Sequence, residues 1–217
     1  MDEDTTRVRG DWNRMAAGYD RGERLQRLVI GDTRARLCGR ARGRTLEVAV
    51  GTGHDLPYYP DGVELTGLDL SPAMLGLARR RAARLGRPVT LVEGDAQDLP
   101  FADGDFDTVL CALALCAIPD QRRALEEMHR VLRPGGLLLL VDHIEYTKAP
   151  WRRREARKER PRRLPRAVAR EVGFTVDRYD RTALGFVERV VAHRPGPGAG
   201  PGAGPGAGSG EEGSIAG

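Results

Sequence analysis

The sequence is poor in cysteine and holds no pair of cysteines at the spacing of a metal site. Cys38, Cys111 and Cys116 are the three cysteines among 217 residues, and none belongs to a C-x-x-C motif. Because nothing in the chain has metal-ligand spacing, we expect no metal centre. Cys111 and Cys116 lie in an apolar stretch and are predicted to be inert buried thiols.

Long apolar runs are also missing. No run approaches the roughly 18 residues that a membrane span requires, and the N-terminal stretch MDEDTTRVRGDW is acidic and polar, unlike a secretory signal. A cytoplasmic location is therefore the expectation. With 217 residues, 40% of them hydrophobic, the chain is long enough for one domain with a full core.

Lysine is nearly absent, and the positive charge is confined to one segment. Only Lys148 and Lys158 are lysines among 35 basic residues, and residues 148–170 hold eleven Lys or Arg against two Glu, a balance of +9. The net charge of +4 leaves −5 on the remainder. We therefore expect no nucleic-acid partner. Segment 148–170 is either a solvated charged surface, or its first half is a flap over an acceptor pocket. The segment is also a candidate for peripheral contact with anionic or membrane surfaces.

The C-terminal stretch has few side chains to bury. From Pro195 it reads PGPGAGPGAGPGAGSGEEGSIAG, with a period of four where collagen has three. Such a stretch cannot offset the entropy cost of ordering, so residues 195–217 are predicted to be a disordered tail. Residues 1–43 are predicted to form an N-terminal helical cap, and residues 44–194 an α/β domain.

Apolar strands alternate with helical patterns through that domain. Strands are predicted over 45–50, 64–70, 88–95, 105–115 and 137–143, and helices over 23–42, 72–85 and 164–172, with a further helix from Asp120 that Pro134 and Gly135 close. Near-continuous apolar strands, each followed by a helix, favour a parallel sheet covered on both faces. The final strands, 174–184 and 185–194, are too close in sequence for a helical crossover and are predicted to form an antiparallel hairpin.

The turn after the first strand suggests a ligand. It reads GTGHDL over 51–56 and lacks the third glycine of the dinucleotide motif G-x-G-x-x-G. Glu47 and Asp55 place carboxylates there, which suits a cationic ligand better than a pyrophosphate. Asp69 ends the second strand, where a carboxylate accepts hydrogen bonds from ribose hydroxyls, and Asp95 follows the third strand, where it can receive an adenine amine. An adenosine with a cationic appendage and no phosphate describes S-adenosylmethionine.

Four motifs carry a family resemblance: LEVAVGTG, LTGLDLSPAML, LVEGDAQDLPFADGDFDTVLC and LEEMHRVLRPGGLLLLVDH. In their order and spacing the sequence resembles class I S-adenosylmethionine-dependent methyltransferases, in the group of ubiquinone/menaquinone C-methyltransferases and small-molecule or phospholipid N-methyltransferases. The resemblance runs from about Trp12 to Arg194. It implies a Rossmann-like three-layer α/β sandwich with a seven-stranded, mainly parallel sheet of order 3-2-1-4-5-7-6, strand 7 antiparallel. It makes 44–194 the methyltransferase domain and S-adenosylmethionine the cofactor.

The resemblance also implies a cofactor site. The residues that it places against the methionine, ribose, adenine and sulfonium parts are Glu47, Gly51, Gly53, Asp69, Leu70, Met74, Asp95, Ala96 and Ala112. For Met74, packing in the core is an equally weighted interpretation. Glu47 has the alternative of a surface charge at the end of a strand, and Asp69 that of capping the following turn, although Ser71 already does so. Ala49 stands where many relatives have glycine.

The implied activity is methyl transfer to a small-molecule acceptor: a quinol, phenol, amine or lipid-like molecule. The sulfonium is already electrophilic, so the protein needs chiefly to position the acceptor and exclude water. Tyr19, which resembles an N-terminal aromatic that closes over the cofactor, and His143, at the end of the fifth strand, are the catalytic candidates, with His54 in the turn. Aminopropyl transfer on the same fold and a non-catalytic cofactor-binding protein remain as alternatives. The acceptor atom and the oligomeric state stay open.

Overall fold

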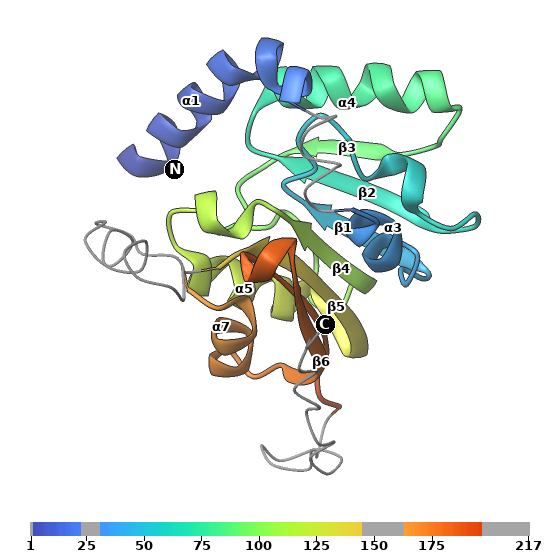
Figure 1. Ribbon diagram of the computed structural model, residues 1–217, viewed down its shortest axis with the longest axis vertical. Coiled ribbons are helices and arrows are strands. Elements are labelled where there is room, and N and C mark those ends of the chain that lie inside the picture. The colour runs from blue at the N-terminus through green and yellow to red at the C-terminus, as the bar shows by residue number, and fades with distance from the viewer. Residues whose placement is uncertain (1, 23–30, 145–162, 197–217) are drawn as a thin grey trace, which may run out of the picture.

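The computed structural model describes residues 2–22, 31–144 and 163–196 (Figure 1). Three predicted features therefore lie wholly or partly outside the described residues. These are most of the first half of the helix predicted over 23–42, the basic segment up to residue 162, and the tail from residue 197. The predicted surface contact of 148–170 and the disorder of the tail stay predictions.

A seven-stranded sheet forms the centre of the molecule, in the order β3-β2-β1-β4-β5-β7-β6. Its strands are β1 Arg44–Val48, β2 Glu64–Asp69, β3 Thr90–Glu93, β4 Phe106–Ala112, β5 Leu132–His143, β6 Thr175–Thr182 and β7 Val187–His193. Neighbouring strands from β3 to β5 pair in parallel, whereas β7 is antiparallel to both β5 and β6. The predicted strand order and the antiparallel strand 7 are confirmed.

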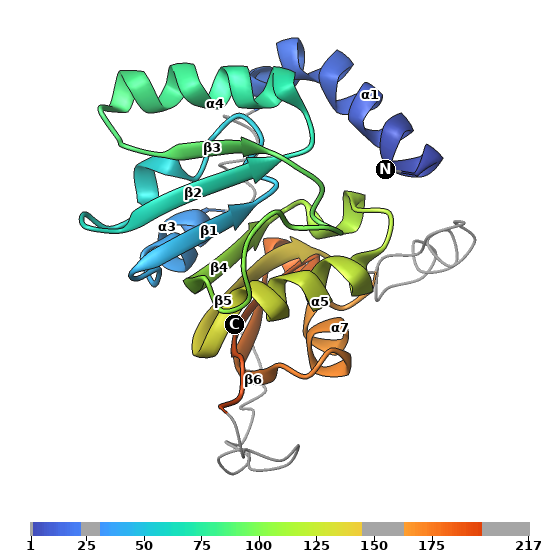
Figure 2. The ribbon, with the colours of Figure 1, turned by 180° about the vertical axis from the view of Figure 1, so that it is seen from behind.

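Helices cover both faces of the sheet, as Figures 1 and 2 show from opposite sides. The helices are α1 Glu3–Tyr19, α3 Thr33–Cys38, α4 Pro72–Leu85, α5 Gln121–Val131 and α7 Pro165–Glu171, with short 3-10 turns η1 Asp20–Gly22, η2 Leu56–Tyr58, η3 Leu115–Ala117 and η4 Ala183–Gly185. One buried core includes α5 and α7, and a second includes α3 and α4. The result is the three-layer sandwich expected from the sequence. None of the described helices is long and apolar enough to cross a membrane.

Helix α4 begins and ends at the residues that the sequence predicts. The Ser71 hydroxyl accepts a hydrogen bond from the Met74 amide at 3.1 Å, and Pro72 occupies the first helical position. Gly86 closes the helix in the left-handed conformation, at φ 61°. These boundary signals are local, so the sequence alone was sufficient to find them.

The boundary between α5 and β5 differs from the prediction. The helix was expected to run to Pro134 and Gly135, but it ends at Val131, and Leu132 is already extended at φ −82°, ψ 131°. Arg133, the residue before Pro134, is disfavoured in the helical region, and Leu132 pairs with Phe106 of β4. The Gly135 amide also donates to the Arg194 carbonyl. The RPGG stretch therefore extends the sheet.

Candidate functional site

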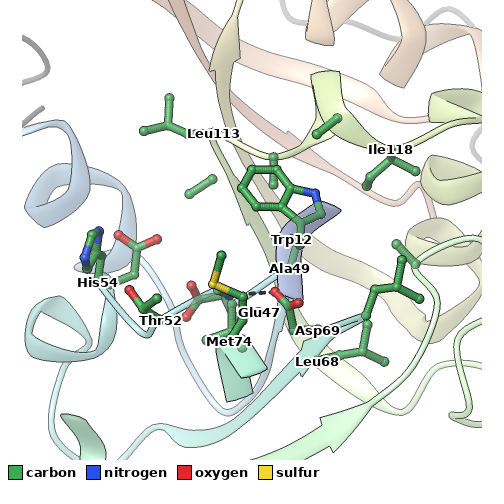
Figure 3. A pocket seen from close by; sticks show the side chains of 18 of the residues that line it. Trp12, Glu47, Ala49, Thr52, His54, Leu68, Asp69, Met74, Leu113 and Ile118 are labelled. Carbon is green, nitrogen blue, oxygen red and sulfur yellow. Dashed lines mark hydrogen bonds between the residues drawn. The ribbon is translucent and has the colours of Figure 1, made fainter. Parts of the chain in front are cut away.

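A pocket of about 100 Å³ lies where β1, β2 and β4 end, at their carboxyl edge (Figure 3). It is lined mainly by the ends of the strands with the glycine turn, by α1, and by residues between 113 and 119 after β4. Arg34 of α3 and Met74 of α4 complete the lining. Since β1 and β4 are neighbours while the chain passes from β1 to β2 on the other side, this is the point where the strand order reverses. Ligands of open α/β sheets bind at such a point.

Asp69 ends β2 and joins the two turns beside the pocket. One carboxylate oxygen accepts a hydrogen bond from the Gly51 amide and the other from the Ser71 amide, both at 2.8 Å. Burial raises the pKa of Asp69, and these two amide bonds oppose that rise. Asp69 therefore braces the turn, as its alternative interpretation held, and it also lines the pocket.

Glu47 is a carboxylate in the floor of the pocket, with 2% of its surface exposed. The Tyr59 hydroxyl donates to it at 2.9 Å. Burial, followed by the negative charge of Asp55, raises the pKa of Glu47 well above its usual range. Arg34 pairs with Asp55, and both line the pocket beside Glu47. Arg34 and Tyr59 were not predicted from the sequence, because their partners lie in other elements.

The glycine turn is open on the pocket side. Gly51 has φ 56°, and no described atom lies within 4 Å of the position that a Cβ would take there. Gly53 is different: it is not among the lining residues, and a Cβ there would lie 2.7 Å from the Leu56 Cδ1 atom. Its need for glycine comes from packing and from its φ of 79°. Ala49, which lines the pocket, holds φ 58° without being glycine.

The remaining residues predicted for the cofactor also line the pocket: Leu70, Met74, Asp95, Ala96 and Ala112. Met74 is 2% exposed, so it packs in the core and also lines the pocket. The Asp95 carboxylate accepts hydrogen bonds from the Gln97 amide at 2.9 Å and from its side-chain Nε2 at 3.0 Å. The structure thus brings eight of the nine predicted positions to one cavity.

Helix α1 contributes aromatic side chains to the pocket. Trp12 and Tyr19 lie with their ring centroids 5.8 Å apart, and Tyr19 stacks on His54 of the glycine turn, also at 5.8 Å. In Figure 3 the Trp12 indole lies between Leu113 and Ile118 on one side and Asp69 and Met74 on the other. Burial raises the pKa of Tyr19, so its hydroxyl stays protonated at neutral pH.

Polar contacts hold α1 in this place. The Asn13 side-chain oxygen accepts hydrogen bonds from the Ser71 hydroxyl at 2.6 Å and from the Ala73 amide at 3.3 Å, at the start of α4. Directly after α1, Asp20 accepts a bond from Thr52 at 2.7 Å and lies 2.9 Å from His54. Burial opposes ionisation of Asp20, but the Thr52 hydrogen bond and the Arg81 charge outweigh it and lower its pKa.

The wall opposite the glycine turn is apolar. Its lining residues are Leu113, Ala114, Ala117, Ile118 and Pro119. The strand prediction to residue 115 was too long, because Leu113 takes φ 55° and the chain turns into η3. The Asp142 carboxylate accepts the Cys116 amide at 2.6 Å and so holds this turn to β5.

The structure corrects two predictions that the sequence suggested near this wall. His143 does end β5, but it is not among the pocket-lining residues. Cys111 is buried as predicted, and Cys38 is buried as well, whereas Cys116 is only half-buried. Its burial was predicted from the apolar run around it, but in η3 it lies beside Asp142 and His143 at the end of β5. Cys116 therefore remains a candidate for chemistry.

Comparison with known proteins agrees with this geometry. Residues 46–140 match a family model described as a methyltransferase domain. Phosphatidylethanolamine N-methyltransferase of Cereibacter sphaeroides is 43% identical over 110 residues, which are 50% of this chain and 54% of that protein. Demethylmenaquinone methyltransferase of Thermus thermophilus is 42% identical over 106 residues, 48% of each chain. The chain spans about half the length of the curated relatives it matches.

A solved structure shows the same fold. The S-adenosylmethionine-dependent methyltransferase of Aquifex aeolicus aligns with a TM-score of 0.60 and 21% identity, over 76% of this chain and 91% of that one. At that identity the likeness concerns the fold alone.

Proposed function

We propose that this chain, a class I S-adenosylmethionine-dependent methyltransferase by family, transfers the cofactor's methyl group to an apolar small-molecule acceptor. The observation that carries the proposal is the pairing of an open glycine turn with two buried carboxylates, Glu47 and Asp69, in one pocket. A pyrophosphate would be repelled there. A nucleoside with a cationic amino-acid part would be attracted.

The residues present fit that cofactor. Both oxygens of Asp69 already accept one amide, and each keeps a lone pair for a ribose hydroxyl. Glu47 is assigned to the methionine amino group, whose positive charge would compensate its burial. Gly51 leaves open space for the methionine part. Leu70, Met74, Asp95 and Ala96 are assigned to the adenine, and Ala112 to the sulfonium side. Gly53 is assigned a role in shaping the turn, since it does not line the pocket.

The acceptor is assigned to the apolar wall of residues 113–119 and to Trp12 of α1. When bound, the cofactor supplies an electrophilic methyl group, so the chain's own task is to orient the acceptor and exclude water. Trp12 and Tyr19 close one side of the pocket and serve that task. Of the two catalytic candidates, Tyr19 is favoured: it lines the pocket and stays protonated, so it can donate a hydrogen bond to the acceptor.

Two relatives guide the choice of acceptor. They are named for methylating a lipid amine and a demethylmenaquinone, and both acceptors carry an apolar body that suits this wall. The sequence alternatives fit less well. Aminopropyl transfer would require carboxylates at the acceptor wall, and residues 113–119 have none. A non-catalytic binding protein would bind the cofactor without turnover.

The test is a transfer assay with methyl-labelled S-adenosylmethionine and a panel of quinols, phenols, amines and thiols. Calorimetry should show binding of S-adenosylmethionine and of its demethylated product but not of NAD. Asp69→Asn should weaken that binding by about 1.5–3 kcal/mol, the scale of a hydrogen bond to a charged group. Asp61→Asn is the matched control, because Asp61 is fully exposed. Binding of NAD in place of S-adenosylmethionine would contradict the proposal, and cofactor binding without turnover on any acceptor would favour the non-catalytic alternative.

A further inference from the structure

We infer that Cys116, Asp142 and His143 form a binding site for a divalent transition-metal ion of the zinc class, beside the apolar wall of the pocket. One donor atom from each residue, a thiol sulfur, a carboxylate oxygen and a ring nitrogen, lies within 4.8 Å of the others. The donors come from η3 and from the end of β5, 26 residues apart. This is why the sequence showed no metal-ligand spacing. The site goes beyond methyl transfer and does not depend on it.

Asp142 is a pre-positioned ligand. Its side chain is 2% exposed, and its two oxygens accept the amides of Cys116 and His143, each at 2.6 Å. These bonds fix the carboxylate and draw the backbones of both other residues around it. Each oxygen retains a lone pair, so the carboxylate can still bind a cation.

The charge of this cluster favours a divalent cation. Among the described residues, the cationic group in ion-pair range of Asp142 is the His143 ring, with Nδ1 at 3.5 Å from Oδ1, and it is charged only when protonated. A buried carboxylate requires compensation by hydrogen bonds and a positive charge. A Cys116 thiolate and the Asp142 carboxylate together carry −2, which a divalent ion neutralises while the imidazole remains neutral.

The donor set selects the kind of metal. Sulfur and imidazole nitrogen suit zinc and its neighbours, whereas magnesium and calcium prefer oxygen alone. Three protein ligands with a fourth position left for water is the arrangement of open zinc sites. Zinc-ligand bonds of about 2.0–2.3 Å place ligand atoms roughly 3.5 Å apart. Cys116 and His143 are only half-buried, so their side chains can move together from separations of up to 4.8 Å while Asp142 stays in place.

A second His–Asp pair in the same chain provides an internal control. His193 lies 2.8 Å from Asp177 through Nδ1, and its side chain is 38% exposed, against 39% for His143. Within the described parts of the chain, only the Cys116 cluster joins three such donors. A histidine beside an aspartate is therefore common to both places, and the thiol distinguishes the proposed site.

The experiment is a Co²⁺ titration of the chelator-treated full-length chain, followed by displacement with Zn²⁺. We expect one equivalent of Co²⁺, with a thiolate-to-cobalt charge-transfer band in the near ultraviolet. Cys116→Ser should remove that band. His143→Gln should weaken Co²⁺ binding by about 100-fold or more, since even loss of an outer-shell partner costs about 10–100-fold. His193→Gln should bind like the unchanged chain.

Co²⁺ titration of the protein without substitutions is sufficient to overturn the inference. If the folded, chelator-treated protein binds less than one equivalent of Co²⁺, or binds it without the thiolate band, Cys116 is not a ligand and the cluster is a hydrogen-bonded clamp on η3. Equal losses in His143→Gln and His193→Gln would show non-specific binding to surface histidines. Calorimetry with S-adenosylmethionine on the same samples separates this result from failure of the proposed activity, because the metal readout involves no cofactor.

Discussion

Replacing Glu47 by glutamine should stabilise the ligand-free protein and weaken cofactor binding at the same time. The side chain is 2% exposed, and glutamine mimics its protonated form in size and shape. The carbonyl oxygen of glutamine can still accept the hydrogen bond of the Tyr59 hydroxyl. The substitution therefore removes the buried charge and leaves the packing in place.

The direction and size of this change in stability follow from the raised pKa of Glu47, which is caused first by burial and then by the Asp55 charge. Between the unfolded value near 4.3 and the higher folded value, the folded state binds more protons than the unfolded state. Stability therefore falls as pH rises through that window, by about 1.4 kcal/mol for each unit by which the pKa is raised. Glu47→Gln should abolish this fall. Its advantage should be absent below about pH 4 and greatest above the window.

The assay is urea unfolding of both proteins from pH 4 to pH 9, with Glu64→Gln as control because the Glu64 side chain is 74% exposed. Calorimetry at pH 8 should show S-adenosylmethionine binding weakened by about 1.5–3 kcal/mol in Glu47→Gln. If the two stability curves run parallel across the whole range, Glu47 is not the group that titrates and the reasoning fails. If stability behaves as expected but affinity does not change, only the assignment to the methionine amino group is wrong.

Two further substitutions test the frame of the pocket. Ala49→Gly should raise the free energy of unfolding by about 0.5–1 kcal/mol, because φ 58° is strained for alanine. The control Ala82→Gly within α4 should lower the free energy of unfolding by a similar amount. A lower free energy of unfolding in both variants would show that Ala49 is not strained. Asn13→Ala should loosen α1 from α4, because the Asn13 side chain accepts hydrogen bonds from the Ser71 hydroxyl and the Ala73 amide. The cofactor dissociation rate should then rise several-fold in stopped-flow measurements, whereas Asp11→Ala, at a side chain that is 48% exposed, should leave it unchanged. Equal rates in both variants would show that α1 does not cover the site.

Local signals in the sequence located the elements that depend on local chemistry. Ser71, Pro72 and Gly86 fix α4 because each acts on its own turn. The end of α5 was missed because a tertiary contact decides it: Leu132 pairs with Phe106, so the helix stops before the Pro134–Gly135 signal. The sheet order came from the family resemblance, since strand order is a matter of long-range pairing.

In the candidate site, too, the sequence predicts some residues and leaves out the contacts that depend on distant parts of the chain. The carboxylates at strand ends were predictable, because parallel strands bring their carboxyl ends to one edge. The partners of those carboxylates were not. Tyr59 reaches Glu47 from a 3-10 turn, and Asn13 meets Ser71 from 58 residues away. Gly53 shows a limit of motif reasoning, because its motif implied ligand contact while its surroundings require glycine for packing against Leu56.

The placement of α1 has a consequence for how such a protein can diversify. The glycine turn and the ends of β1 and β2 belong to the stretch 46–140 that the family model covers, whereas Val8, Trp12 and Tyr19 lie outside it. The side of the pocket formed by the strand ends and the glycine turn and the side that α1 closes therefore belong to separate stretches of the chain. Exchange of this one helix between relatives would change the side of the pocket that Val8, Trp12 and Tyr19 form, while the strand ends and the glycine turn keep their sequence.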